Sequence, residues 1–345
     1  MINSLQIEYI KTIGLYNLLG TGIGFTNPFS IALSSDNRIF VLNRTRPRIV
    51  ICTLDDEYLG DFASAQDLEE PDTRLSLPTS MAFNSQDNLH VVDEDNHKVY
   101  IYNSDGVFRQ EWGEYGTGNG EMNGPSGIAF DSEDNAYVVD QNNHRIQKFD
   151  SDGKYIFQWG KLGQSNGQFE LPWGIAIDSE NNVFVADWRN DRVQQFSSDG
   201  KFINSFGSSG DTNGQLNRPS DVAVDNQGNI YVADWGNERV QVFDRYGNST
   251  SNIRGSGTVS KWAEDFLVAN LDEKLTRETS NLFPDITPHL DSTYHISSQN
   301  EAYFWGIASL TLDKKGRLYV TESNRHRFQV FQTNDASQLR NPHVN

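Results

Sequence analysis

The chain has 345 residues, a formal net charge of -19 at pH 7 and one cysteine, Cys52. Such an acidic chain is a poor partner for nucleic acid, because binding to phosphates needs a basic face. One cysteine excludes an intrachain disulfide framework and a cysteine-rich zinc site. No run of about 18 apolar residues is present, so no membrane span is expected. The first residues lack the basic start and compact apolar run of a signal peptide, which predicts a cytoplasmic protein.

The first predicted element in chain order is a strand at residues 5–14. Its sequence EYIKTIG resembles KFINSFG (201–207), which ends a later repeat. We expect this N-terminal strand to complete the last repeat, and so to close a ring and hide its edges.

Six copies of one repeat follow the N-terminal strand. Five copies start at a proline: Pro28, Pro78, Pro125, Pro172 and Pro219. In the sixth copy Ile307 stands in place of the proline. The prolines are spaced by 50, 47, 47 and 47 residues, and a polar or acidic residue and then a cation recur at fixed distances after each. Because the repeats and one insertion account for nearly the whole chain, we predict a single domain over residues 1–345.

Each repeat predicts four short strands. In the fourth copy these are GIAID, VFVAD, RVQQF and KFINSFG, separated by turns rich in Asn, Asp and Gly. Four-stranded units at this period are typical of propeller blades, so the sequence predicts an all-β, six-bladed β-propeller. A small alanine, Ala176 in this copy, recurs where an innermost strand crowds around the axis.

The repeat also resembles a known family. The pattern P-x-G-[IV]-A-[VI]-D, then N-x-[YF]-V-[AV]-D, then N-x-R-[IV]-Q-x-F is similar to the NHL repeat, most closely in blades 3, 4 and 5. The resemblance covers nearly all of the chain except the insertion, and it implies a six-bladed propeller.

The NHL family includes peptidyl-α-hydroxyglycine α-amidating lyases, which hold zinc through histidines directly after the blade prolines. None of the matching positions here is histidine: they are Phe29, Thr79, Ser126, Trp173, Ser220 and Ala308. The zinc-dependent amidating activity is therefore not expected, and the sequence requires no metal or other cofactor.

Residues 256–306 form an insertion between blades 5 and 6. The segment SKWAEDFLVANLDEKLTRETSNLF predicts one helix that starts at the N-cap Ser260 and ends before Pro284. Its apolar side consists of Trp262, Ala263, Phe266, Leu267, Leu271 and Leu275. The second half of the insertion, ITPHLDSTYHISSQNEAYFWG, predicts a loop that can include a short strand. We expect the insertion to cover the axial mouth as a lid, and the alternative is that it packs on the rim of a blade.

Aromatic residues break the repeat on one face, called the top face here, which carries the loops after the fourth strands and between the second and third strands. The predicted substrate-binding aromatics are Phe29, Trp173, Trp188, Trp235, Phe304 and Trp305. Clustered aromatics bind apolar rings or cations. The alternative is that these rings pack against one another and against the insertion.

Charged residues also break the repeat on the top face. Asp221 replaces the Gly or Ser of other blades and is a candidate general base or cation partner, or else a solvated surface acid. Arg44 is a candidate catalytic residue, and Arg46 and Arg325 are candidates for substrate binding. In the insertion, the candidate catalytic residues are His289, Tyr294 and His295. The two histidines could instead bind a metal or lie on the surface.

Together these features predict a propeller that binds a small molecule or peptide in an aromatic pocket under a lid, and that acts as a lyase or hydrolase. The acidic chain favours a neutral or cationic, partly apolar ligand, with neither nucleic acid nor membrane as a partner. The alternative is a non-catalytic scaffold for protein interaction. A closed pocket favours the enzyme, whereas an open, flat mouth favours the scaffold.

Overall fold

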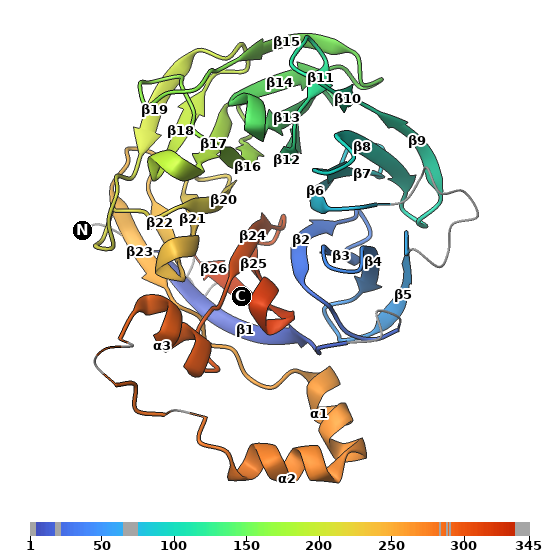
Figure 1. Ribbon diagram of the computed structural model, residues 1–345, viewed down its shortest axis with the longest axis vertical. Helices are drawn as coiled ribbons and strands as arrows, with labels where there is room; N and C mark the ends of the chain where they lie inside the picture. The colour runs from blue at the N-terminus through green and yellow to red at the C-terminus, as the bar shows by residue number, and fades with distance from the viewer. Residues whose placement is uncertain are drawn as a thin grey trace, which may run out of the picture.

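The computed structural model describes residues 5–17, 22–64, 75–282, 284–287, 289 and 291–334 (Figure 1). Six four-stranded sheets surround a central axis, which confirms the predicted six-bladed β-propeller. In each of these six sheets neighbouring strands are antiparallel, and in blades 1 to 5 they follow chain order outward from the axis, because short polar turns join each strand to the next. A helical segment lies between blades 5 and 6 in the chain.

The innermost strands of blades 1 to 6 are β2 (Pro28–Leu33), β6 (Pro78–Phe83), β12 (Pro125–Phe130), β16 (Pro172–Ile177), β20 (Pro219–Val224) and β24 (Ile307–Leu312). The second strands are β3 (Ile39–Asn43), β7 (Asn88–Asp93), β13 (Ala136–Asp140), β17 (Val183–Asp187), β21 (Ile230–Asp234) and β25 (Arg317–Glu322). The third strands are β4 (Arg48–Cys52), β8 (Lys98–Asn103), β14 (Arg145–Phe149), β18 (Arg192–Phe196), β22 (Arg239–Phe243) and β26 (Arg327–Asn334). The outermost strands are β5 (Tyr58–Phe62), β9 (Phe108–Trp112), β15 (Tyr155–Trp159), β19 (Phe202–Phe206), β23 (Ser249–Ile253) and, in blade 6, β1 (Gln6–Gly14).

The ring closes through β1, which pairs antiparallel with β26 from Gln6 opposite Asn334 to Gly14 opposite Arg327. Blade 6 is thus built from both ends of the described chain, and β1 sweeps along its outer edge (Figure 1). A short parallel pair, β10 (Glu114–Tyr115) and β11 (Glu121–Met122), shapes the loop from blade 2 to blade 3. The hydrophobic core consists of separate clusters sandwiched between neighbouring sheets.

A buried acid at the end of the second strand fixes the top-face loops. In blade 4 the Asp187 side chain is fully buried and accepts hydrogen bonds from Glu170 N, Asn190 Nδ2 and Arg192 Nε, each at 2.9 Å. The chain then makes a 3-10 turn, η3 (Trp188–Asn190), which ends on Asp191 with φ 50. Equivalent turns in three other blades are η2 (Gln141–Asn143), η4 (Trp235–Asn237) and η6 (Ser323–Arg325). These pinned turns form a rigid base for side chains that differ between blades.

The insertion contains three helices: α1 (Lys261–Ala269), α2 (Leu271–Thr279) and α3 (Thr293–Gln299). The Ser260 side chain accepts the Ala263 N–H at 3.1 Å, as predicted for the N-cap. The prediction of one continuous helix is wrong, because Asn270 breaks it with φ -128 and ψ 81. The predicted loop with a short strand is also wrong, since α3 forms there with Ser292 as its N-cap. Serine and asparagine side chains compete for backbone hydrogen bonds and so favour helix ends.

The described insertion does not cover the axis, so the expected lid is not found. In α1 only Trp262 is buried, and its ring lies 5.5 Å from that of Phe25 between blades 6 and 1. Its Nε1 donates to Asp56 O at 2.7 Å, in the turn between β4 and β5. This anchor holds α1 and α2 at the rim, outside the ring of blades (Figure 1). Within the described ranges, no helix is long and apolar enough to cross a membrane.

Replacing Trp262 by alanine is expected to release α1 and α2 without unfolding the blades, because α2 buries none of its own residues. Limited proteolysis followed by mass spectrometry should then show rapid cleavage within residues 261–282 and an intact propeller. Phe266 is 42% exposed, so Phe266→Ala serves as the control and should be cut as slowly as the wild type. Equal cleavage rates in all three proteins would show that another contact anchors the helices.

Candidate functional site

Two of the predicted aromatic residues meet over the axis of the ring. Phe29 and Trp173 start the innermost strands of blades 1 and 4, which are opposite blades because the inner strands contact one another in the order β2, β6, β12, β16, β20, β24 and back to β2. Their ring centroids are 6.2 Å apart. The two rings therefore face each other across the top end of the axial channel. Trp188 extends this cluster, with its centroid 6.4 Å from that of Trp173.

Arg44 lies on the aromatic pair. Its guanidinium carbon is 4.6 Å from the Phe29 ring centroid and 5.9 Å from that of Trp173, distances typical of cation–π contact. Its Nη2 donates to Glu94 Oε2 at 2.5 Å. Its Nη1 is buried and has no hydrogen-bond partner among the described residues. Arg44 is thus held in one orientation and keeps a free donor at the top of the channel.

Asp221 lies in the axial channel. It is the third residue of β20, whereas Trp173 is the second residue of β16, so Asp221 lies one residue further from the top face. The channel cavity has a volume of about 300 Å³ and is lined by the inner strands, Asp221 included. The Asp221 carboxylate accepts the N–H groups of Val222 and Leu310, each at 2.9 Å. Burial raises the pKa of this carboxyl from 3.8 to about 7, and the backbone hydrogen bonds offset only part of that rise. Asp221 is thus half-buried and lines the channel together with the inner strands.

A comparison within the ring indicates that the charge of Asp221 exceeds a structural need. Ser30 occupies the same position in blade 1, and its hydroxyl accepts the N–H of Met81 in the next blade at 3.2 Å. Asp221 makes the same kind of link to Leu310. A neutral hydroxyl suffices for this bond between blades, whereas a buried carboxylate without a cationic partner is costly. Among the described ion pairs none involves Asp221.

The predicted residues Trp188, Trp235 and Arg46 are less closely grouped. Two arginines that the sequence analysis did not select, Arg189 and Arg218, place their guanidinium carbons 5.4 and 5.2 Å from the Trp188 ring centroid. Trp235 is half-buried at the start of η4. Arg46 is exposed and has a positive φ of 58 in its turn.

The remaining predicted residues lie on the insertion side of blade 6. Phe304 is fully buried in the core against Phe331, with centroids 5.8 Å apart, so its ring does not reach the surface. Arg325 Nη2 donates to the carbonyl oxygens of Ser297 at 2.6 Å and Asn300 at 2.8 Å, and so holds the end of α3. Trp305 lies 5.8 Å from Tyr294, measured between centroids.

The two histidines of the insertion do not join Asp221. His295 Nδ1 lies 2.7 Å from Ser292 Oγ in the first turn of α3, and His289 is exposed. Tyr294 is 46% exposed. Within the described ranges, no group of three or more His, Cys, Asp or Glu side chains is placed to hold a metal ion.

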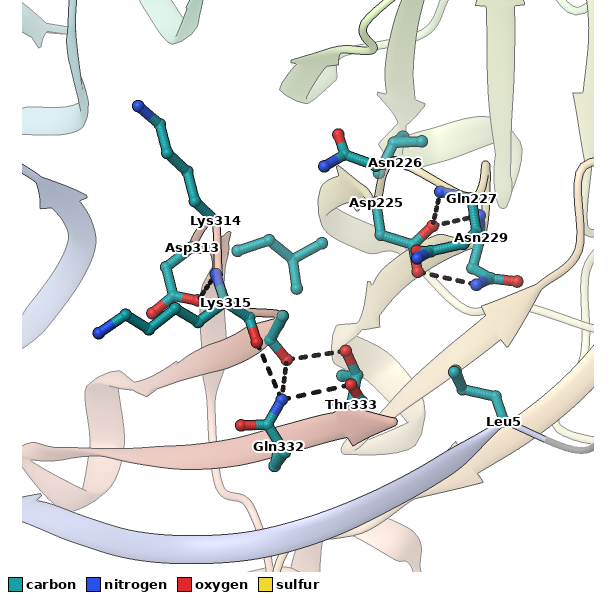
Figure 2. Close-up of a pocket in the computed structure, with 13 residues that line it drawn as sticks. Leu5, Asp225, Asn226, Gln227, Asn229, Asp313, Lys314, Lys315, Gln332 and Thr333 are labelled. Carbon is teal, nitrogen blue, oxygen red and sulfur yellow. Dashed lines mark hydrogen bonds between the residues drawn. The ribbon is translucent and has the colours of Figure 1, made fainter. Parts of the chain in front are cut away.

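Further clefts flank the blades, and two of them are described below. One, of about 540 Å³, separates α1 and α2 from the top of blade 6. The other, of about 380 Å³, lies on the face opposite the top face, between the hairpin turns of blades 5 and 6 (Figure 2). In this second cleft Asp225 accepts hydrogen bonds within its own turn, and Gln332 donates to the carbonyls of Lys315 and Gly316. Its polar groups mainly satisfy one another, as expected of a gap between repeats.

Sequence reasoning missed Glu238. This residue ends η4 with φ 49, and its carboxylate accepts the Gly306 N–H of the next blade at 2.8 Å. Burial, and then the nearby Glu322, raise the pKa of Glu238 to about 7 from 4.5. The signal was a glutamate at the repeat position that holds His97 and His144 in blades 2 and 3.

The raised pKa of Glu238 predicts that stability falls as pH rises. Between about pH 4.5 and 7, Glu238 keeps a proton in the folded chain that it has lost in the unfolded chain. The contribution of Glu238 to stability is therefore full below about pH 4.5 and is lost as pH rises through 7. Glu238→Gln keeps the acceptor for Gly306 and should unfold at higher urea concentration than the wild type at pH 8, but not at pH 4.5. Equal midpoints at pH 8 would contradict the assignment.

Comparisons with known protein families agree with the propeller fold. The model of the NHL repeat matches residues 216–243 and 304–331, and that of the SMP-30/Gluconolactonase/LRE-like region matches residues 117–213. No curated protein matches the chain.

Several solved structures share the fold at low sequence identity. A structure described as streptogramin B lyase is 13% identical, with a TM-score of 0.58 over 96% of this chain and 98% of that one. A catalytically inactive histidine-to-alanine variant of virginiamycin B lyase from Staphylococcus aureus, with quinupristin, is also 13% identical, with a TM-score of 0.58 over 95% of this chain and 99% of that one. An auxiliary nutrient binding protein from Bacteroides thetaiotaomicron is 10% identical, with a TM-score of 0.61 over 95% of this chain and 77% of that one. Repeat pattern, blade count and family models together identify the chain as a six-bladed β-propeller that carries NHL repeats.

Proposed function

We propose that the chain is a lyase whose reaction centre lies in the axial channel beneath Phe29, Trp173 and Arg44, with Asp221 as the general base. The observation that carries the proposal is the Asp221 carboxyl, which lines the channel, makes no described ion pair and has its pKa raised to about 7 by desolvation. A base with a pKa near the working pH is the most effective kind at neutral pH. Such perturbed groups in a cavity are candidates for function.

The proposed reaction is an elimination. Asp221 takes a proton from a carbon next to a carbonyl group, and the electron pair of that C–H bond forms a double bond as the bond from the neighbouring carbon to the leaving group breaks. The leaving group departs with its electron pair and is protonated by Asp221 or by water. Arg44 Nη1, which has no described partner, supplies a donor for the oxygen on which negative charge develops. The similar folds described as streptogramin B and virginiamycin B lyases support elimination chemistry on this scaffold.

The substrate is proposed to be a neutral or cationic, partly apolar small molecule or peptide. The channel volume of about 300 Å³ admits one small group, such as a single side chain, at the lower end of the usual range for ligand pockets. The carboxyl of Asp221 disfavours an anion there. The aromatic pair lies across the top end of the channel, so a ligand that enters from that face passes its rings.

The test is a screen of cyclic and linear peptides and depsipeptides, with quinupristin among them, followed by mass spectrometry. An elimination gives products whose summed mass equals that of the substrate, whereas hydrolysis adds one water. We expect products whose masses include no added water. Where entry of the substrate past the two rings limits the rate, Phe29→Ala should turn the substrate over faster than the wild type. Products that carry an added water would replace the lyase assignment by a hydrolase. A complete lack of turnover by the wild type would contradict the proposal.

A second candidate function, a scaffold for protein interaction, rests on the apolar surface of the insertion. Val268, Leu271 and Leu275 are 69, 71 and 60% exposed, an unusual arrangement for short helices. A scaffold of this kind should lose its partner when Leu271→Ser and Leu275→Ser are combined, and should keep it in Asp221→Ser. A lyase should lose turnover in Asp221→Ser and keep it in the double variant.

A further inference from the structure

We propose that the cleft between α1, α2 and the top of blade 6, here called the insertion cleft, is a second ligand site, which binds a carboxylate with a long apolar tail. Its volume of about 540 Å³ is within the range of small-molecule pockets. It is lined from the end of β1, the insertion and η6, and so is separate from the axial channel. The proposal does not depend on the proposed lyase activity.

One wall of the insertion cleft is apolar. It is formed by Leu15, Val259, Ala263, Phe266, Leu267 and Leu282. Phe266 and Leu267 are turned toward the cleft because Trp262, one turn earlier, fixes α1 against the blades. A surface of this kind matches an alkyl chain, which gains free energy on leaving water.

The opposite wall carries three nitrogen atoms that are shielded from water and have no hydrogen-bond partner among the described residues. They are Trp305 Nε1, Arg325 Nε and His326 Nδ1. The Arg325 guanidinium carbon is 5.7 Å from the Trp305 ring centroid, so the two side chains are neighbours. Buried donors are nearly always paired in folded proteins, and three unpaired nitrogens along one cleft indicate a missing acceptor.

The repeat shows that the unpaired state of His326 is unusual. At the same position in blades 2 and 3, His97 Nδ1 accepts the Gly124 N–H at 3.0 Å and His144 Nδ1 accepts the Leu171 N–H at 3.1 Å. Each of these bonds ties one blade to the next. His326 keeps the same left-handed backbone, with φ 53, but its ring stacks on Tyr16 with centroids 4.4 Å apart. Its Nδ1 is therefore free to meet a ligand, and burial lowers its pKa and keeps the ring neutral.

Of the charged residues that line the insertion cleft, Arg325 and Glu273 make no ion pair among the described residues. Arg277 pairs with Glu301 at 2.5 Å, and Arg327 pairs with Glu322 at 2.8 Å. Arg325 donates only to carbonyl oxygens among its described bonds, although Glu322, Glu301 and Glu238 are near enough to act on its charge. The two oxygens of a ligand carboxylate can accept from Arg325 Nε and Trp305 Nε1 together, which is a strong arrangement. The neutral imidazole of His326, with its proton on Nδ1, gives a third donor.

The test uses decanoate, at concentrations below micelle formation, with the full chain. In an NMR spectrum of the 15N-labelled indole N–H groups, the resonance of Trp305 is identified by its absence from Trp305→Phe. Decanoate should shift this resonance. Calorimetry should show at least tenfold weaker binding by Trp305→Phe, which removes the donor and keeps a ring, and by Leu267→Ser, which alters the apolar wall. Trp188→Phe, near the axis, should bind as the wild type does. Decanol and decylammonium, which share the tail, should bind at least tenfold more weakly than decanoate.

The proposal is overturned if decanoate leaves the Trp305 indole resonance in place, or if decylammonium binds the wild type as tightly as decanoate does. Unchanged affinity in both Trp305→Phe and Leu267→Ser would also overturn it. Because Leu267 is only half-buried, that variant keeps the test decisive if Trp305→Phe fails to fold.

Discussion

Replacing Asp221 by serine is expected to lower kcat/KM for the substrate of the axial channel by about 10²–10⁴-fold, the usual loss when a general base is removed. The fold should survive, because Ser30 makes the equivalent bond between blades with a hydroxyl. Removing this half-buried carboxyl, which has no described cationic partner, should even raise the urea midpoint measured above pH 7, where the folded chain must hold the charge. Steady-state kinetics and urea unfolding of the same preparation measure both effects.

The pH profile gives an independent check on Asp221. Its basic form is populated above a pKa of about 7, so kcat/KM should rise with pH up to that value and then level off. Ser30→Ala, which removes the matching hydroxyl from blade 1, is the control and should keep full activity and the same profile. Activity of Asp221→Ser within tenfold of the wild type would mean that the carboxyl has no part in proton transfer.

Replacing Asp187 by alanine is expected to destabilise the fold by about 3–5 kcal/mol, because the change leaves the buried Arg192 guanidinium without its carboxylate. The same carboxylate also holds Glu170 N, Asn190 Nδ2 and Gln194 Nε2, the last at 3.1 Å. Burial raises the pKa of Asp187 although these donors and Arg192 oppose the shift. The urea midpoint at pH 7 is the measurement, with circular dichroism to follow the strands.

A matched control is available in the same blade. Asp199 pairs with Lys201, but their side chains are 54% and 81% exposed. Asp199→Ala should leave the urea midpoint unchanged, since solvent screens exposed ion pairs. Similar losses in both variants would mean that burial of the Asp187 network does not set its contribution.

The repeat made the fold predictable from the sequence, but the insertion was predicted only in part. The N-cap at Ser260 followed from local chemistry, because a serine before an apolar helical face satisfies the first free N–H groups. The break at Asn270 did not follow, since the apolar positions continue across it with a helical period while the backbone does not. The place of α1 depended on Trp262 inserting between blades 6 and 1, a contact between segments far apart in the chain.

The candidate site was predicted as residue types rather than as an arrangement. Positions that depart from the repeat pointed to Phe29, Trp173, Arg44 and Asp221. The same rule also selected Phe304, which is a core residue, because a departure from the repeat does not distinguish an exposed ring from a buried one. Glu238 escaped notice because its carboxylate replaced other polar side chains at a loop position.

The sequence by itself determined the number of blades, the strand order within each blade and the buried acid–cation pairs that fix the loops. These features repeat every 47 residues in most of the chain, and each depends on residues that are near neighbours in one blade or the next. Only the tertiary structure decided that Phe29 meets Trp173 across the axis, that Asp221 lines the channel beneath them and that the insertion sits on the rim. Contacts across a ring join side chains from blades that are far apart in the chain. They depend on how those side chains fill the centre of the ring, which the pattern within one repeat does not determine.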